Sequence, residues 1–120
     1  MIRHQFNALV KERLKMCLDT LCRKSDEYST EDVFHNFKVA ATVQNCSPEY
    51  ALGGMMAKHT VSVYDLIRKT EGGEEIPPEL WDEKIGDSIN YLLLLSALVK
   101  ERYDESNTGS SDESPSHTDC

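Results

Sequence analysis

Apolar residues recur at three- and four-residue intervals along the first part of the chain, which is the spacing of one face of an α-helix. Lys11, Glu12, Lys15 and Asp19 fill the other side, so the pattern predicts an amphipathic helix over residues 3–23. The apolar positions are Phe6, Leu9, Val10, Leu14, Cys17, Leu18 and Leu21. A polar connection follows at residues 23–30.

A second apolar face begins after this connection. Ser29 or Thr30 can cap the helix, and Glu31 and Asp32 would lie in its first turn, where the helix dipole favours acidic side chains. The apolar face consists of Val33, Phe34, Phe37, Ala40, Ala41 and Val43.

Ser47 and Pro48 form a start signal for a third helix, with serine as the N-cap and proline at the first helical position. The helix is expected to run to about Thr70 and to end at Gly72 and Gly73. The pair Gly53-Gly54 inside it lowers helix stability by roughly 1 kcal/mol per glycine. Such a loss indicates a kink or a close approach of another helix at this point.

A fourth helix is predicted from about Glu79 to Tyr103, after the sequence Ile-Pro-Pro. Residues 104–120 are rich in Ser, Asp and Thr and are expected to be disordered. No stretch of strand length alternates between apolar and polar residues. The sequence therefore predicts an all-α protein, a four-helix bundle over residues 1–103 with an acidic tail at 104–120.

The length of 120 residues allows one domain. No apolar run approaches the roughly 18 residues that a membrane span needs, and the N-terminus lacks the apolar segment of a secretory signal, so we expect a cytoplasmic protein with no membrane partner. The four cysteines lack the spacing of a zinc site or the density of a disulfide scaffold, so we expect free thiols. The net charge of −8 argues against direct binding of nucleic acid.

Two carboxylates and an amide lie on one line of the fourth helix. At 100° per residue, Glu83, Asp87, Asn90 and Leu94 fall within about 60° of one another. Alone, this line would be an ordinary solvated face, with the core on the opposite side. Because Tyr91, Leu94 and Leu98 continue on or next to the carboxylate side, we expect that side to be covered further along, by another helix or another subunit. The expected core side holds Trp81, Ile85, Ile89, Leu92 and Ser96.

The third helix has one narrow polar line, formed by Lys58, Ser62, Asp65 and Lys69. A helix that is apolar over the rest of its girth is usually central in a bundle. If the polar lines of the third and fourth helices face each other, Asp65, Glu83 and Asp87 would supply oxygen ligands for Mg²⁺ and Lys58 would supply a cation. The alternative is pairing within one helix, for instance of Asp65 with Lys69.

For three further residues a structural interpretation is favoured over a chemical one. His59 lies beside apolar residues, and an interior or interface histidine is the simpler interpretation of it. Cys17 and Cys22 lie on or near an apolar face, which favours packing over nucleophilic chemistry.

Four blocks of the sequence resemble a family of small phage and prophage proteins, grouped as a nucleotide-modification-associated domain. The resemblance covers about residues 5–102 and the blocks keep their order. They are Lys24-Ser-Asp-Glu-Tyr28, Asp32-Val-Phe-His-Asn-Phe-Lys-Val-Ala-Ala, Met56-Ala-Lys-His-Thr-Val-Ser-Val-Tyr-Asp65 and Leu80-Trp-Asp-Glu-Lys-Ile-Gly-Asp-Ser-Ile-Asn-Tyr91. The family is distantly similar to the MazG-like all-α NTP pyrophosphohydrolases, which are Mg²⁺-dependent helical oligomers.

The resemblance implies roles for particular residues. Glu83 and Asp87 match the second acidic motif of the MazG-like enzymes, whose Glu and Asp hold metal, although Lys84 stands where those enzymes usually have an acid. Their first motif, several glutamates, is replaced here by Lys58, His59, Ser62 and Asp65, a set that suits nucleotide binding better than hydrolysis. Lys24 and Tyr28 would add a phosphate contact and a stacking ring. Their alternative is an ordinary exposed turn.

Three functions follow from these observations. The first is Mg²⁺-dependent hydrolysis of a nucleotide phosphoanhydride, with Glu83, Asp87 and Asp65 positioning the metal. The second is binding without chemistry, in which a phage protein sequesters a signalling or modified nucleotide, with Lys58, His59, Ser62, Lys24, Tyr28 and Asn90 as contacts. The third is an assembly or adaptor protein that uses its apolar helix faces. A fourth helix that is apolar all round in its second half also predicts a homodimer or homotetramer.

Overall fold

The computed structural model of the chain describes residues 1–28 and 32–107. All regular secondary structure in these residues is helical, in four elements: α1 (Arg3–Tyr28), α2 (His35–Gln44), α3 (Pro48–Glu71) and α4 (Pro78–Ser106). The predicted all-α class with four helices is therefore confirmed. The disorder predicted for the tail concerns residues that lie mostly outside the described part of the chain, but residues 104–106 continue α4.

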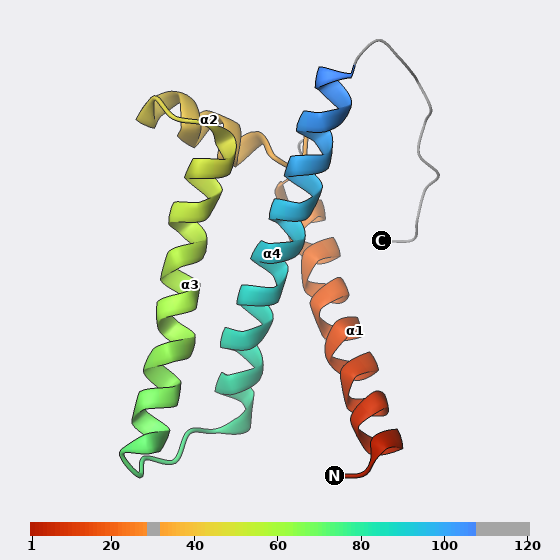
Figure 1. Ribbon diagram of the computed structural model, residues 1–120, viewed down its shortest axis with the longest axis vertical. Coiled ribbons are helices and arrows are strands. Elements are labelled where there is room, and N and C mark those ends of the chain that lie inside the picture. The colour runs from red at the N-terminus through yellow and green to blue at the C-terminus, as the bar shows by residue number, and fades with distance from the viewer. Residues whose placement is uncertain (29–31, 108–120) are drawn as a thin grey trace.

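The three long helices lie beside one another, with α4 between α1 and α3, and the short α2 crosses the end of the molecule where α3 begins (Figure 1). The helices α1 and α4 run in the same direction and α3 runs opposite to both. The backbones of α1 and α3 make no contact with each other. Of the three long helices, α4 is therefore the central one, whereas the sequence predicted a central third helix; α3 also packs against two helices, α2 and α4.

The start of α3 follows the sequence closely. Ser47 is the N-cap, its hydroxyl accepting a 3.1 Å hydrogen bond from the backbone N–H of Tyr50, and Pro48 is the first helical residue. The helix ends at Glu71, one residue beyond the expected end, and Gly73 follows in a left-handed conformation with φ of 92°. Glycine has no Cβ, so it adopts this conformation without strain and lets the chain turn toward α4.

The first two helices differ from the prediction at their boundary. The first helix was expected to end near residue 23, but α1 continues to Tyr28, because Lys24 and the polar residues after it contain no glycine or proline to stop a helix. The caps expected from Ser29 and Thr30 lie outside the described residues. Asp32 lies before α2, where its carboxylate accepts a 2.9 Å hydrogen bond from the backbone N–H of Phe34.

The pair Gly53-Gly54 does not mark a close approach of another helix. A Cβ built at either glycine would meet no atom within 4 Å. The expectation of close helix packing at this point is therefore wrong, and the two glycines face open space.

The core is small and lies where α2, α3 and α4 meet. Phe34, Phe37, Leu52 and Leu98 form its buried cluster, with Met55, Met56, Tyr91, Leu94 and Leu95 packed against it. The buried face of α4 thus includes Leu98 and Asn90, while Leu92 is 56% exposed. The predicted core side of the fourth helix is wrong in part, and the cover expected for Tyr91, Leu94 and Leu98 is found. Packing against α3 favours this face because the apolar residues of α2 lie on the same side.

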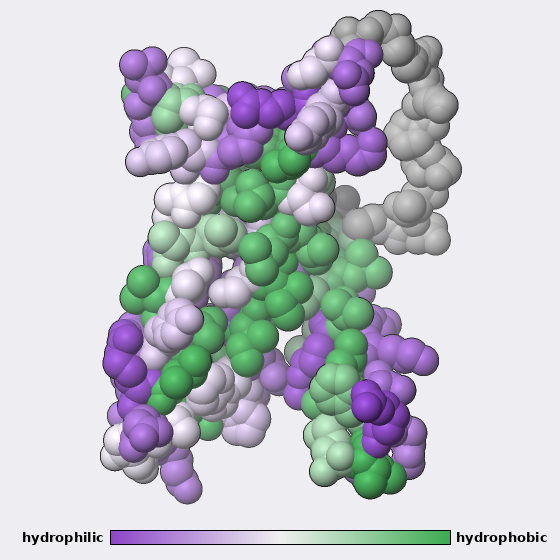
Figure 2. Space-filling model, viewed as in Figure 1, coloured by the Kyte–Doolittle hydropathy of each residue, from purple (hydrophilic) through white to green (hydrophobic). Residues whose placement is uncertain are grey.

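Large apolar side chains also remain exposed, above all on α1 and α4. Figure 2 shows them (green) along the middle of one face and along α1. They include Phe6, Leu14, Leu18, Leu92 and Leu93. None of the described helices combines the length and the hydropathy needed to traverse a bilayer.

The cysteines differ in state. Cys17 and Cys46 are free, but Cys22 is disulfide-bonded, so the prediction of free thiols fails for Cys22. Spacing along the sequence does not show which sulfur atoms meet in space. Cys17 is 5% exposed, and burial raises the pKa of its thiol, which supports a packing role.

Candidate functional site

A groove of about 710 Å³ runs between α1 and α4. Residues of both helices line it: Arg13, Met16, Cys17, Thr20, Arg23 and Lys24 from α1, and Glu79, Asp82, Glu83, Ile85, Gly86, Asp87, Ile89 and Asn90 from α4. Its size lies within the usual range of small-molecule sites, roughly 300–1,000 Å³. Four of the residues singled out in the sequence, Lys24, Glu83, Asp87 and Asn90, line this groove.

The carboxylates of the α4 wall are held to different degrees. Glu83 is 59% exposed and lies 3.5 Å from the ammonium of Lys84, the residue next to it. Asp87 is 26% exposed, and its Oδ2 lies 3.6 Å from Nδ1 of His59 on α3. Asp87 is thus the more firmly positioned of the two, while Glu83 is free to turn toward a ligand.

Asn90 is the one polar side chain classed as buried among the described residues, with 7% of its surface exposed. Its Oδ1 has no hydrogen-bond partner. A buried acceptor without a partner lowers stability by about 1–3 kcal/mol, because it has lost water and gained nothing in return. Its place in the groove wall makes this amide a ready contact for a ligand.

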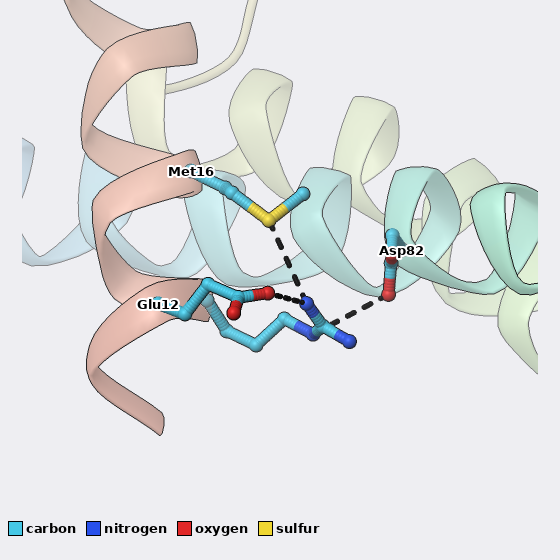
Figure 3. Close-up of polar contacts among 4 residues, drawn as sticks. Glu12, Met16 and Asp82 are labelled. Carbon is cyan, nitrogen blue, oxygen red and sulfur yellow. Dashed lines mark hydrogen bonds and ion pairs between the residues drawn. The ribbon is translucent and has the colours of Figure 1, made fainter. Parts of the chain in front are cut away.

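Arg13 ties the α1 wall to the α4 wall. Its Nε lies 3.4 Å from Oδ1 of Asp82, and its Nη1 donates to Glu12 at 2.6 Å and to the sulfur of Met16 at 3.7 Å. Figure 3 shows Glu12 and Met16 on α1 and Asp82 on α4 gathered around this guanidinium. Because the pair is partly exposed, it contributes at most about 1 kcal/mol, but it fixes the width of the groove at one point.

Two more cations, Arg23 and Lys24, line the same wall further along α1. The groove therefore sets a basic wall on α1 against an acidic wall on α4. The side chain of Tyr28, the ring expected to stack on a base, lies outside the described residues.

The polar line of α3 does not face the acidic line of α4. Asp65 pairs with Arg68 of its own helix, and the hydroxyl of Ser62 donates to the backbone carbonyl of Lys58 at 3.1 Å. Neither Asp65 nor Ser62 lines the groove. The pairing of Asp65 within its helix matches the alternative interpretation, with Arg68 in place of Lys69.

Lys58 and His59 line a different hollow, of about 310 Å³, between α2, α3 and α4. The ring of His59 stacks on that of Tyr91, with the centroids 4.7 Å apart and the planes 29° from parallel. The side chain of His59 is 20% exposed. It is therefore mostly interior, as the simpler interpretation expected, and its exposed part lines this hollow.

Within residues 1–28 and 32–107, no three side chains of His, Cys, Asp or Glu gather closely enough to hold a metal ion. Mg²⁺ does not need such a cage, since it often takes one or two protein carboxylates and completes its shell with phosphate oxygens and water. Glu83 and Asp87, hard oxygen donors one helical turn apart, fit that smaller role.

Arg13 and Arg23 are groove residues that the sequence interpretation missed, whereas Lys24 was predicted. Arg13, Thr20 and Lys24 follow one another at intervals of seven and four residues, so they share one face of α1. This spacing is visible in the sequence, but the apolar residues on neighbouring positions of α1 favour a packing role for the helix.

The groove can hold an anion on its α1 side and hydroxyl or amine groups on its α4 side, next to apolar surface from Met16, Ile85 and Ile89. Such a set of contacts suits a ligand that has an anionic group, polar groups and an apolar part. Searches of protein-family models, of curated proteins and of solved structures found no match for this chain.

Proposed function

We propose that the groove between α1 and α4 binds a nucleotide. The observation that carries this proposal is Asn90, whose buried amide oxygen has no partner and whose side chain lines the groove. After a rotation of the amide, an N–H of a base or an O–H of a ribose would provide the missing hydrogen bond. This hydrogen bond would then contribute to the free energy of ligand binding.

The two walls divide the ligand between them. Arg23 and Lys24 would contact the phosphates, because guanidinium and ammonium groups are the usual partners of phosphate oxygens. Met16 and Ile89 would lie against the base.

Glu83 and Asp87 are the residues that would hold Mg²⁺ entering with the phosphates, and the ion would supply positive charge to the phosphate oxygens. We favour binding over hydrolysis, because Asp65 is held on its own helix by Arg68. Sequestration of a signalling or modified nucleotide by a phage protein, in the cytoplasm of the host, is the role that agrees best with this arrangement.

Hydrolysis of the nucleotide is the second candidate. It is favoured by the position of Asp87, which lines the groove and is oriented by His59 from behind. An adaptor function without a small ligand is the third, and the exposed apolar faces of α1 and α4 favour it.

A binding experiment with a matched pair of variants tests the proposal. Nucleoside triphosphates and cyclic nucleotides are added with and without Mg²⁺, and thermal unfolding is followed. A ligand present at 100 times its Kd stabilises the native state by about 2.7 kcal/mol. The variants are Gly86→Leu, which fills the groove, and Gly54→Leu, which fills the other hollow. At both positions the new Cβ meets no atom within 4 Å.

The expected result is a rise in melting temperature for the wild type and for Gly54→Leu, and none for Gly86→Leu. Recovery of intact nucleotide supports sequestration. Release of pyrophosphate that is lost in Asp87→Asn supports the enzyme instead. If no nucleotide raises the melting temperature, the groove is not a nucleotide site and the adaptor function gains support.

A further inference from the structure

The hollow between α2, α3 and α4 is separate from the groove and, unlike it, has no acidic residue in its walls. Its walls are formed by Gln44, Ala51, Gly54, Met55, Lys58, His59 and Tyr91. None of these seven residues is acidic, whereas the groove has four acids in its α4 wall. In a chain with a net charge of −8, a hollow that has a lysine and no carboxylate in its walls attracts anions locally.

Lys58 forms no ion pair that stabilises the described part of the fold. Its ammonium makes no ion pair with any residue in the described part of the chain, unlike Lys38, Lys84 and Lys100, which each pair with a carboxylate. A lysine at the edge of a hollow, without a partner, is available to a ligand.

The aromatic wall of the hollow is held in place. Tyr91 stacks on His59 and meets the ring of Phe37 edge-on, with the centroids 6.2 Å apart and the planes at 78°. Phe37 is itself 8% exposed and belongs to the core. The ring wall is therefore anchored from behind and does not need to rearrange when a ligand binds, which lowers the entropic cost of binding.

A glycine, which has no side chain, widens the hollow. Gly54 lies in its wall, and a Cβ added there would meet nothing within 4 Å. Glycine inside a helix lowers its stability relative to alanine, by up to about 1 kcal/mol. The chain thus keeps a less stable helix at the position where a larger residue would occupy the hollow.

We infer that this hollow binds a small molecule that carries an oxyanion, a phosphate or a carboxylate group. Lys58 supplies the opposite charge, and the amide of Gln44 and a ring N–H of His59 supply hydrogen-bond donors. The remainder of the ligand lies against Met55 and the bare backbone of Gly54. The volume of about 310 Å³ exceeds that of an oxyanion alone and leaves room for a short organic part.

Amide NMR spectra of the full chain at constant ionic strength test this inference. Inorganic phosphate, acetate and phenyl phosphate are titrated in turn, with chloride as the baseline, and the resonances of Gly54, Lys58 and His59 are followed. Phosphate and acetate distinguish the two kinds of oxyanion, and phenyl phosphate tests the organic part. Lys58→Met and Gly54→Leu are compared with Gly86→Leu, which alters only the groove.

The expected result is a saturable shift of the three resonances with at least one probe. Loss of the lysine charge should weaken that binding about tenfold, which corresponds to about 1.4 kcal/mol. Gly54→Leu should abolish it, and Gly86→Leu should leave it unchanged. The absence of saturation with all three probes, or equal binding to Gly54→Leu, would overturn the inference. Because the two glycine variants act on different cavities, failure here and failure of the nucleotide proposal are separable.

Discussion

Nδ1 of His59 lies 3.6 Å from Oδ2 of Asp87, across the contact between α3 and α4. Asp87 lines the groove and His59 lines the separate hollow, so this contact is the thin wall between two cavities. One side of α4 faces α1 and another side faces α3. Residues that are adjacent in the sequence, such as Asn90 and Tyr91, therefore line different cavities.

A double-mutant cycle of His59→Gln and Asp87→Asn measures this contact. Both side chains are about three-quarters buried, so we expect a coupling free energy of about 0.5–1 kcal/mol from urea unfolding at neutral pH. The exposed pair of Lys100 and Asp104 within α4 is the matched control, with an expected coupling near 0.3–0.5 kcal/mol. A coupling of zero for the first pair would show that Asp87 is not positioned by His59.

Gly86→Ala should stabilise the protein. The glycine lies inside α4, and the added methyl group meets no atom within 4 Å, so the gain in helix propensity of about 0.5–1 kcal/mol is not offset by a clash. Thermal unfolding should show a melting temperature higher by several degrees. A lower melting temperature would mean that α1 packs closer to Gly86 than described.

Asn90→Leu should raise stability and remove nucleotide binding together. The substitution replaces a buried acceptor that has no partner with an apolar side chain of similar size, which avoids a penalty of about 1–3 kcal/mol. Urea unfolding and the nucleotide thermal shift measure the two effects separately. Asn90→Asp is the contrasting variant, expected to be less stable than the wild type because it buries a charge. Unchanged nucleotide binding in Asn90→Leu would remove Asn90 from the site.

The ion cluster of Asp32, Lys38 and Glu101 should make stability depend on pH at both extremes. Nζ of Lys38 lies 2.7 Å from Asp32 and 2.8 Å from Glu101. The hydrogen bond from Lys38, and then that from the N–H of Phe34, lower the pKa of Asp32. The stabilisation by Asp32 is therefore complete above about pH 4 and is lost as the pH falls through its lowered pKa.

The contribution of Lys38, the basic residue of the same cluster, depends on pH in the opposite direction to that of Asp32. Hydrogen bonds to Asp32 and then to Glu101 raise the pKa of Lys38, so its contribution is complete below about pH 10 and is lost as the pH rises through the raised value. Since the groups are more than a third exposed, each effect should stay below about 1 kcal/mol. Urea midpoints measured between pH 2.5 and 11 should show a weaker dependence in Lys38→Met. An identical pH profile in that variant would contradict the assignment.

Self-association remains a prediction, and the structure shows which exposed apolar residues could form the interface. Leu92 and Leu93 are 56% and 46% exposed on the central helix, and Phe6 is 48% exposed on α1. Monomeric proteins rarely expose contiguous apolar patches of more than a few hundred Å². Light scattering at micromolar concentration should give the mass of a homodimer or homotetramer, and Leu92→Glu should lower it. Val43→Glu, at the exposed end of α2, is the control, and a monomeric wild type would refute the prediction.

The helices could be predicted because their signals are local. Ser47 and Pro48 start α3, and Gly72 stops it, through contacts within a few residues. The end of α1 was placed too early because polarity alone does not stop a helix, and Lys24 is as good a helix former as the residues before it.

The partners of the helices could not be predicted in the same way. The line of Glu83, Asp87 and Asn90 was recognised, but one sequence gives no rule for whether that line meets α1 or α3. The structure turns most of the line to α1, and the contact of Asp65 with Arg68, three residues away, needed no partner helix at all. Side-chain periodicity fixes a direction around each helix axis and leaves the neighbour in that direction undetermined.

Among the described helices, α1 packs only against α4, and this bears on how slowly each part of the chain exchanges its amide hydrogens with solvent. Since α1 makes no backbone contact with α3, it can detach while the cluster around Leu52 and Leu98 stays closed. Its amides should exchange first and those around Leu98 last. A molecule held between α1 and α4 would then slow exchange along α1 far more than elsewhere, so deuterium uptake reports occupancy of the groove without any knowledge of what occupies it.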